Sequence, residues 1–434
     1  MPPTRRRALA VAAALLPGAL AGCLADEERQ ATVTTFEDPE RVTATEGGLD
    51  RLVEANTAFA LDLYRRFADR NEGNLFASPY SVSVALAMAW AGADGETRTE
   101  MAETLGFTFD DETVHRAFAE LWHELDARSD VDVDRNTGEN QAFELNVANA
   151  LWGHEEFPFS DEYLETLRTY YAGGVHEVDF VDDPGAARDL INAWVADRTG
   201  GHIEELLPRG SVNANTRVVL TNAIYFLASW YHPFPADDTE PRRFENLEGT
   251  TTTVPTMRQS AEFPYTEVDG HQVVELPYVG QDVAMLVVVP ESGAFEGFER
   301  SLDTARLTEL VEGLRRRDGD VTLPKFEVES TLAASEALQA LGMERAFDGR
   351  ADFGGMVDGE NPGLSIDEVY HQSFVSVDER GTEAAAATGV PMPVDGPENP
   401  FELVVDRPFL FAIRDRPTGT VLFLGRVVDA GAFG

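Results

Sequence analysis

Residues 378–388 read DERGTEAAAAT, and this stretch decides which fold the sequence predicts. It follows a short alternating run that is typical of a strand and that ends at Val377. Apart from Glu383, the residues from Gly381 to Gly389 have small side chains. A short alanine helix or a flexible loop are alternatives. Such a helix, however, lacks an apolar face and would end at Pro391, and a flexible linker is richer in Ser and Gly.

A third interpretation is a segment that enters an existing sheet as an additional strand. Alternate residues of a strand share one face, so positions 382, 384, 386 and 388 would face a core, and each of them is Thr or Ala. The one charged residue among them, Glu383, falls on the opposite face, where it can stay in water. The stretch therefore predicts a strand that can slide between two others.

The chain as a whole is strongly acidic. It has 434 residues, 77 Asp and Glu against 34 Lys and Arg, and a formal net charge of −43. This charge repels phosphate backbones and anionic lipid head groups, so no nucleic-acid partner is expected. Of the basic residues, 33 are Arg and one is Lys, Lys325. Genomic base composition is one explanation. The other is a halophilic source, because at ~1 M salt the Debye length is about 3 Å and repulsion between surface carboxylates nearly vanishes.

The first 22 residues resemble an export signal. Arg5, Arg6 and Arg7 resemble the twin-arginine type, and the apolar residues 8–21 are too few to span a bilayer as a helix. The signal closes on Cys23 in a sequence that resembles a lipobox, so Cys23 would be lipidated and would anchor an extracellular protein to the membrane. The alternative is an ordinary secretion signal followed by a chance cysteine. Cys23 is the only cysteine, so no internal disulfide can form.

The remaining chain is predicted to contain a tether and one large domain. Residues 23–49 are polar, acidic and without apolar periodicity, which predicts a flexible tether. Residues 50–434 contain no internal repeat and no dividing linker. Helices are predicted within residues 52–68, 74–91, 160–171 and 186–198. Buried strands are predicted at Val218–Phe226, Val283–Val289, Val321–Phe326, Phe409–Ile413 and Val421–Val427. Early helices and later, mostly antiparallel strands indicate an α+β fold.

Motifs for catalysis and metal binding are absent from the sequence. It contains no phosphate-binding Gly-rich loop, no His-Glu-x-x-His, no cysteine pair and no Gly-x-Ser-x-Gly, and its eight histidines are scattered singly. We therefore predict no enzyme, no cofactor and no metal site. An enzyme or a solute-binding lipoprotein remains the alternative, because catalytic groups can converge in space alone.

Residues 378–388 closely resemble the hinge of inhibitory serpins, a family of serine protease inhibitors. Other segments resemble the same family, collinearly from Asn74 to Val427, and are specific only together. They are Asn74–Gly106, Asn192–Val195, Leu220–Phe226 with Trp230 and Phe234, Glu275–Tyr278, Leu323–Phe326, Leu341–Met343, Arg407–Phe409 and Phe423–Val427. The resemblance implies a single-domain α+β fold in which helices pack on three β-sheets, with an exposed reactive-centre loop at about residues 381–400.

The resemblance also implies roles for individual residues. The hinge that enters the main sheet would comprise Glu379, Gly381, Thr382, Glu383, Ala384, Ala385, Ala386, Ala387 and Thr388. The sheet would part over a buried hydrogen-bond cluster, the shutter, made by Ser78, Ser81, Asn222 and His371. Trp230 would pack at the point of insertion, and Lys325 would pair with Glu379. The alternative for this last pair is an ordinary surface ion pair that contributes ~0–1 kcal/mol.

The mechanism implied by the resemblance is that of a suicide substrate. A serine protease, subtilisin-like in the simplest case, would attack the loop and stay trapped as an acyl-enzyme when the hinge inserts. In the usual register of the family the cleaved bond lies between Asp395 and Gly396, with Val394 as the alternative residue before the bond. We expect a monomer that needs no cofactor.

The sequence departs from the family pattern at three places. His202 and Leu227-Ala228 stand where Lys and Lys-Gly are common. Pro391 and Pro393 cannot donate a hydrogen bond to a sheet, so insertion would end near Val390. These prolines favour the alternative function, a non-inhibitory serpin that is cleaved or binds a partner without trapping a protease.

Overall fold

The computed structural model describes residues 33–35, 38–130, 144–154, 159–171, 174–359, 363–382 and 400–433. All of them belong to the second of two compact units, Thr32–Gly434. The predicted export signal, Cys23, hinge positions 383–388 and the proposed bond at 394–396 lie outside the described residues.

Nine helices occur within the described residues. They are α1 (Gly48–Ala68), α2 (Pro79–Trp90), α3 (Gly95–Leu105), α4 (Asp111–Asp126), α5 (Asp161–Tyr170), α6 (Pro184–Arg198), α7 (Phe295–Ser301), α8 (Thr304–Gly313) and α9 (Ser335–Ala340). All twelve residues of α2 are buried, as expected of a helix that is apolar on every side. The side chain of Ser78 accepts a hydrogen bond from Ser81 N, and Pro79 occupies the first turn, so α2 begins where the Ser-Pro signal predicts.

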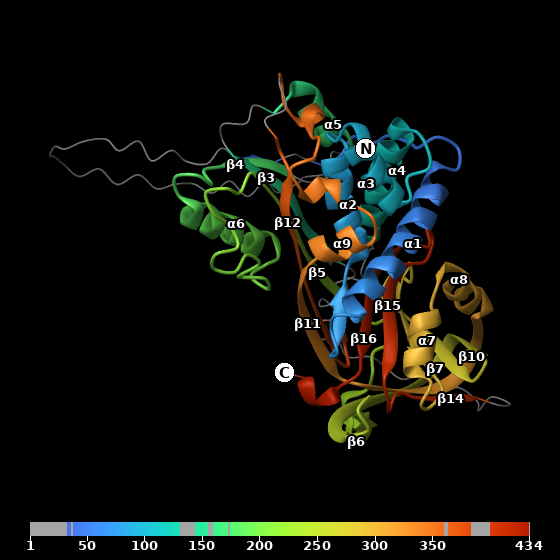
Figure 1. Cartoon of the computed structure of the whole chain (residues 1–434). Helices are drawn as coiled ribbons and strands as arrows, with labels where there is room; N and C mark the ends of the chain where they lie inside the picture. Colours follow the sequence, from blue (N-terminus) through green and yellow to red (C-terminus); the bar gives the residue numbers. More distant parts are fainter. Residues whose placement is uncertain are drawn as a thin grey trace, which may run out of the picture. The chain divides into compact units, whose positions relative to one another are not determined.

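A seven-stranded sheet contains the described start of the predicted hinge, Gly381 and Thr382. In spatial order its strands are β1 (Val33–Thr35), β4 (Gly174–Val178), β3 (Glu144–His154), β5 (Val218–Ser229), β13 (Gly381–Thr382), β12 (Ile366–Val377) and β11 (Phe326–Ala333). α1 to α4 lie on one side of this sheet and α6 on the other (Figure 1). β13 is only two residues long, and below it β5 and β12 pair directly and in parallel over residues 218–225 and 366–374.

The remaining strands form one nine-stranded sheet. Its continuous path is β14 (Phe401–Val404), β10 (Arg315–Pro324), β7 (Thr251–Val268), β8 (His271–Pro277), β9 (Val283–Val289), β15 (Phe409–Asp415), β16 (Val421–Val427) and β2 (Leu75–Ala77), and β6 (Glu240–Glu245) pairs with β7. The α+β class is confirmed. Two of the three expected sheets are joined by hydrogen bonds, because the 18-residue β7 pairs with β6, β10 and β8 in succession.

Two boundaries differ from the prediction. The strand expected at Val321–Phe326 is two strands: β10 ends at Pro324, β11 begins at Phe326, and they belong to different sheets. Lys325 lies between them, where its N–H donates to Pro255 O at 2.9 Å. Pro324 and Lys325 interrupt the apolar run at the junction, and β11 alternates between buried and exposed residues, so the sequence carries a sign of the break that the single-strand prediction did not use.

The second difference concerns the predicted tether. α1 begins at Gly48, and residues before it already contact the body: Glu40 N donates to Thr169 O at 2.9 Å, and Ala44 N to Glu120 Oε2 at 2.7 Å. β1 pairs antiparallel with β4 at the edge of the seven-stranded sheet. The folded body thus starts before Asp50. Its backbone finds partners on α4, α5 and β4, which a composition-based prediction cannot foresee.

Candidate functional site

The hinge begins in a tight turn between β12 and β13. Val377 pairs with Thr382, and Asp378 N donates to Gly381 O at 3.0 Å. The carboxylate of Asp378 closes the turn from inside, because its Oδ1 accepts hydrogen bonds from Arg380 N at 2.8 Å and Gly381 N at 3.2 Å. β12 and β13 therefore form the start of a hairpin, which could lengthen only by moving further into the sheet.

Neighbouring backbone and side-chain groups hold this turn on its outer side. Trp230 donates from its ring Nε1 to Asp378 O at 3.0 Å and from its backbone N to Arg380 O at 2.8 Å. Phe234 N donates to Glu379 O at 2.8 Å. The carbonyls of three successive turn residues are thus all satisfied, two of them by Trp230, at the place where the sequence predicted it.

Glu379 and Lys325 lie together at the base of the loop. Lys325 Nζ is 2.8 Å from Glu379 Oε2, and Thr239 Oγ1 donates to Glu379 Oε1 at 2.9 Å. Partial burial acts to raise the pKa of Glu379, but the hydrogen bond from Lys325 and further donors outweigh it and hold the pKa below its ordinary value. Because Lys325 sits at the junction of β10 and β11, the pair joins the turn to both sheets.

Gly381 and Thr382 already occupy the space between two strands. Gly381 pairs with Ser229 and Thr382 with Ala228 of β5. A Cβ at position 381 would lie 2.1 Å from Ala228 O, so only glycine allows the backbones to approach this closely. The side chain of Thr382 is fully buried, and its hydroxyl lies 2.8 Å from the hydroxyl of Tyr278.

The ring of Tyr278 is fully buried and is itself held in place. It stacks on Trp230 with centroids 4.5 Å apart and planes at 7°. Tyr278 lies in the motif Glu275–Tyr278, but its contact with Thr382 spans 104 residues and could not be predicted from the motif.

Below Thr382, β5 and β12 are held together on their core-facing side by a buried polar contact. His371 and Asn222 are register partners, and His371 Nδ1 lies within hydrogen-bond distance of Asn222 Oδ1. Ser78 N donates to His371 Nε2 at 2.9 Å, so Nδ1 carries the ring proton and donates to Asn222. Burial lowers the pKa of His371 to about 4, which keeps the ring neutral.

The same network contains all four residues predicted for the shutter. Ser78 Oγ donates to Leu422 O at 2.7 Å, and Ser81 Oγ donates to Asn149 Oδ1 at 3.0 Å. Asn222 Nδ2 contacts both Ser81 Oγ and Asn149 Oδ1. Asn149 on β3 was not predicted. It joins the β3–β5 pair to α2, and no local sequence signal separates it from other strand asparagines.

The architecture of this site matches one protein family along most of the chain. The family model for serpins, described as serine protease inhibitors, matches residues 54–430. The chain belongs to the serpin family. An uncharacterized serpin-like protein of Thermococcus kodakarensis is 39% identical over 387 residues, which cover 88% of this chain and 87% of that protein.

Characterised and solved members of the family are also similar to this serpin. The leukocyte elastase inhibitor of Bos taurus is 36% identical over 391 residues, 87% of this chain and 99% of that protein. The crystal structure of the thermophilic serpin tengpin in its native state matches this chain with a TM-score of 0.80 at 26% identity, over 92% of this chain and 100% of tengpin. The chain is therefore a member of a family composed mostly of inhibitors rather than catalysts.

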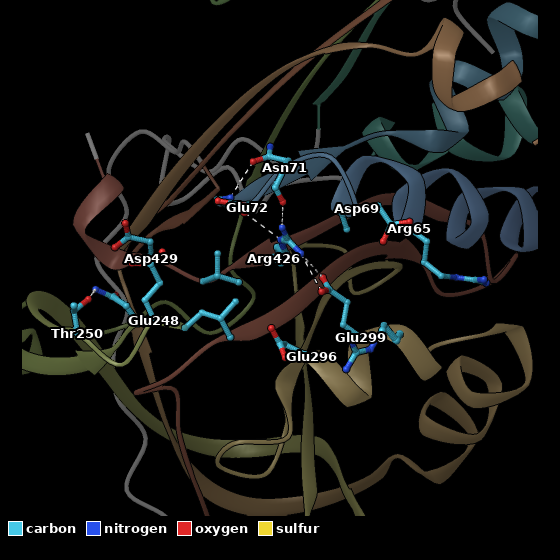
Figure 2. Close-up of a pocket in the computed structure, with 16 residues that line it drawn as sticks. Arg65, Asp69, Asn71, Glu72, Glu248, Thr250, Glu296, Glu299, Arg426 and Asp429 are labelled. Atoms are coloured by element: carbon cyan, nitrogen blue, oxygen red, sulfur yellow. Dashed lines mark hydrogen bonds and ion pairs between the residues drawn. The ribbon is translucent and has the colours of Figure 1, made fainter. Parts of the chain in front are cut away.

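A pocket beside the nine-stranded sheet contains the contacts that hold β16 in place. It has a volume of about 730 Å³ and is lined by the end of α1, by α7 and by residues of β16 and the β6–β7 turn (Figure 2). Arg426 of β16 crosses it, contacting both carboxylate oxygens of Glu299 at 3.0 and 2.9 Å and donating to the backbone oxygens of Asn71 and Gly73. These contacts fix β16 against α1 and α7.

Two further findings bound the chemistry of the described residues. No cluster of three or more His, Cys, Asp or Glu side chains among them has a geometry that could hold a metal ion. No helix in the described part of the chain is long and apolar enough to cross a bilayer.

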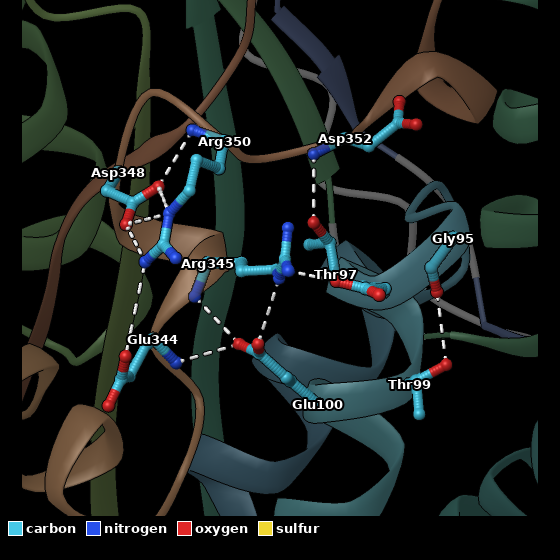
Figure 3. A network of polar contacts seen from close by, with 10 residues as sticks. Gly95, Thr97, Thr99, Glu100, Glu344, Arg345, Asp348, Arg350 and Asp352 are labelled. Atoms are coloured by element: carbon cyan, nitrogen blue, oxygen red, sulfur yellow. Dashed lines mark hydrogen bonds and ion pairs between the residues drawn. The ribbon is translucent and has the colours of Figure 1, made fainter.

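A second polar network holds the segment after α9 in place. Glu100 of α3 accepts hydrogen bonds from Glu344 N at 3.0 Å and from Arg345 N at 2.8 Å, and Asp352 N donates to Thr97 Oγ1 at 2.9 Å (Figure 3). These contacts tie the segment that leads into β12 to α3, on the side of the sheet where α1 to α4 lie.

Proposed function

We propose that this serpin inhibits serine proteases as a suicide substrate, by cleavage of its loop and insertion of the hinge between β5 and β12. The observation that carries the proposal is β13. Both of its residues pair with β5 and Thr382 also pairs with β12, while β5 and β12 pair with each other directly below. The first step of insertion is thus already present, and the path for the rest is a single strand–strand contact.

The register of β13 specifies where each hinge residue would go. Thr382 opposes Ala228 on β5 and Val377 on β12, both antiparallel. Six residues further along, position 388 would therefore stand between Asn222 and His371, which are partners in the uncleaved sheet. A threonine hydroxyl donates one hydrogen bond and accepts others, so Thr388 would accept from His371 Nδ1–H and donate to Asn222 Oδ1. The inserted strand would replace the contact that it breaks.

Insertion would release enough free energy to distort a bound protease. About ten new ladder hydrogen bonds at a net ~0.5–1.5 kcal/mol each amount to on the order of 10 kcal/mol. The acyl-enzyme would be displaced before water could deacylate it. We propose Asp395–Gly396 as the cleaved bond, with Val394 as the alternative residue before it; Asp395 would suit an acid-preferring protease and Val394 an elastase- or subtilisin-like one.

The setting proposed for this activity is outside the cell and in strong salt. The signal-like residues 1–22 and the lipobox-like sequence before Cys23 support an exported monomer anchored by a lipid. The net charge of −43 and the near-absence of Lys support a halophilic source. Subtilisin-like proteases are the proposed targets.

The test is incubation of the full chain carrying Cys23→Ser with subtilisin in strong salt, with an elastase-like and an acid-preferring protease in parallel. A covalent band that resists boiling in detergent is expected on a denaturing gel. Mass spectrometry of the released C-terminal peptide identifies the cleaved bond from its first residue.

Two other outcomes would separate the alternatives. Cleavage without a covalent band, but with a large rise in melting temperature, would mean that insertion occurs too slowly to trap; Pro391 and Pro393, which donate no backbone hydrogen bond, would be the first residues to replace. Cleavage without any rise in melting temperature would overturn the proposal in favour of a non-inhibitory serpin that binds a partner.

A further inference from the structure

The outer face of the β5–β12 contact is covered by one histidine ring. His202 stacks on Tyr225 of β5 with centroids 4.0 Å apart and planes at 5°, and its centroid is 6.5 Å from that of Phe374 of β12 at 18°. Tyr225 and Phe374 are register partners. They form the end of the direct β5–β12 pairing that lies nearest to β13. The ring of His202 therefore lies across the line along which the two strands would separate.

The backbone around His202 is held firmly by α6. Thr199 Oγ1 donates to Val195 O at 2.8 Å and accepts from Ile203 N at 3.2 Å, so it links the end of the helix to the residue after His202. Gly201 N donates to Ala196 O at 2.7 Å, and Gly201 has a φ of +84°, which suits glycine. His202 N donates to Thr199 O at 3.1 Å. The ring thus projects from a short, hydrogen-bonded turn.

Insertion must open the sheet at Tyr225 before it reaches the shutter. With Thr382 opposite Ala228, the third residue to enter would stand between Tyr225 and Phe374, and the sixth between Asn222 and His371. An inserted strand moves its two neighbours apart by about 4.8 Å. The ring of His202 could then no longer contact both Tyr225 and Phe374.

We propose that His202 is a positioning residue that holds the β5–β12 contact closed and slows hinge insertion. The proposal rests on the proposed function, since it concerns the rate of the same insertion. His202 would act through its contacts with Tyr225 and Phe374. A lysine, which is common at this position in serpins, has no ring and cannot stack on both strands.

The test compares His202→Ala and His202→Lys with the parent chain, in full-length protein carrying Cys23→Ser. After rapid cleavage of the loop by subtilisin and addition of a subtilisin inhibitor, insertion is followed as the time-dependent gain of melting temperature. Loss of an aromatic contact of ~0.5–1.5 kcal/mol predicts insertion about twofold to tenfold faster in both variants. Faster insertion should also lower the number of serpin molecules consumed per trapped protease.

The matched control is His271→Ala. His271 also packs on an aromatic ring, with its centroid 4.6 Å from that of Phe298, but lies on β8 of the other sheet. This variant should change neither the insertion rate nor the number of inhibitors consumed. If His271→Ala accelerates insertion as much as His202→Ala does, the effect is general destabilisation, and this would overturn the role of His202.

A second comparison tests the bridging itself. Phe374→Leu removes the ring on the β12 side, so His202→Ala should accelerate insertion by less in that background than in the parent. Equal acceleration in both backgrounds would overturn the bridge. If the cleaved parent chain gains no stability at all, insertion does not occur and the proposed function fails with this inference. If the parent inserts but His202→Ala inserts no faster, this inference alone fails.

Discussion

Two buried strand contacts in this serpin differ in the side chains that hold them. Where β5 meets β12, the core-facing side chains include Asn222, His371 and Ser373, all fully buried and hydrogen-bonded. Where β15 meets β16, the core is aromatic: Phe76 stacks between Phe411 and Phe423, at centroid distances of 5.7 and 4.9 Å. The first contact lies in the sheet that the proposed insertion would open, and the second lies in the sheet that it would leave unchanged.

The difference indicates which contacts a protein can exchange. A hydrogen bond broken by an entering strand can be remade with a group on that strand, so its net cost is small. An interdigitated aromatic contact has no such replacement, and separating it would leave a cavity. β16 is also fixed by the ion pair between Arg426 and Glu299 (Figure 2). We infer that polar side chains hold the β5–β12 contact, which the proposed insertion would open, and that aromatic side chains hold the β15–β16 contact, which it would leave closed.

The largest effect is expected from a charge at the first inserted position. Thr382→Arg would place an unpaired guanidinium where the native side chain is fully buried between β5 and β12. We expect cleavage by subtilisin to continue, while the covalent complex falls by about two orders of magnitude, as a few kcal/mol of burial cost imply. The readout is the ratio of complex to cleaved chain on a denaturing gel.

The control for this prediction is Thr382→Val. It keeps the shape of threonine and loses only the contact with the Tyr278 hydroxyl, so it should still trap. Trapping by Thr382→Arg at the parental level would mean that this position need not stay in the sheet for a protease to be trapped.

A large but different effect is expected in the fixed sheet. Phe423 is fully buried, and Phe423→Ala should lower the free energy of unfolding by about 3–5 kcal/mol through lost contacts and a cavity. Because insertion leaves β15 and β16 paired, the uncleaved and cleaved forms should lose the same amount. Denaturant unfolding of both forms checks this, and a loss confined to one form would contradict the division into an opening and a fixed sheet.

The sequence predicts the parts of this architecture that local pattern determines. α2 begins at its Ser-Pro signal, and β5, β9, β15 and β16 lie where apolar runs predict them. Gly381 and Thr382, the first of the small residues predicted to form the hinge, form β13 between β5 and β12. Each of these signals lies within about a dozen neighbouring residues, the range over which periodicity is informative.

The remaining parts depend on contacts between distant segments. Asn149, Tyr278 and Phe374 carry no local signal for their contacts, since their partners lie 48 residues or more away. The break at Lys325 is a different case, because its signal is local: Pro324 and Lys325 interrupt the apolar run, and β11 then alternates between buried and exposed residues.

A smaller effect is expected from pH at the shutter. The pKa of His371 is lowered to about 4 in the folded chain, against an ordinary value of about 6.5. Below pH 6.5 the unfolded chain binds a proton that the folded chain does not, so stability falls as the pH drops towards 4 and is unaffected above about 7. At pH 5 the loss is about 2 kcal/mol.

The measurement is denaturant unfolding at pH 7 and pH 5 in the same salt, for the parent and for His371→Gln. Glutamine can accept from Ser78 N and donate to Asn222 without titrating. The other buried histidines with lowered pKa, His115 and His176, are present in both proteins, so their contributions cancel in the difference. An equal pH dependence in parent and variant would show that His371 already binds its proton near the ordinary pKa.

The smallest effect is expected at the base of the loop, where an ion pair joins the two sheets. The Lys325 side chain is 37% exposed and that of Glu379 16%, so the pair resembles a surface ion pair, with a contribution of about 0–1 kcal/mol that falls further in strong salt. Lys325→Gln should therefore lower the unfolding free energy by less than about 1 kcal/mol, since Glu379 keeps its hydrogen bond from Thr239.

The informative comparison is with Lys325→Arg. Every other basic side chain of this protein is arginine, so a tolerated exchange would show that the single lysine is incidental. Lys325 lies in the one-residue gap between β10 and β11, where a compact ammonium fits the Glu379 carboxylate and a planar guanidinium needs a wider approach. We expect Lys325→Arg to be no more stable than Lys325→Gln in denaturant unfolding. A clear gain over Lys325→Gln would show that charge alone, and not the shape of the ammonium, joins the hinge to the fixed sheet.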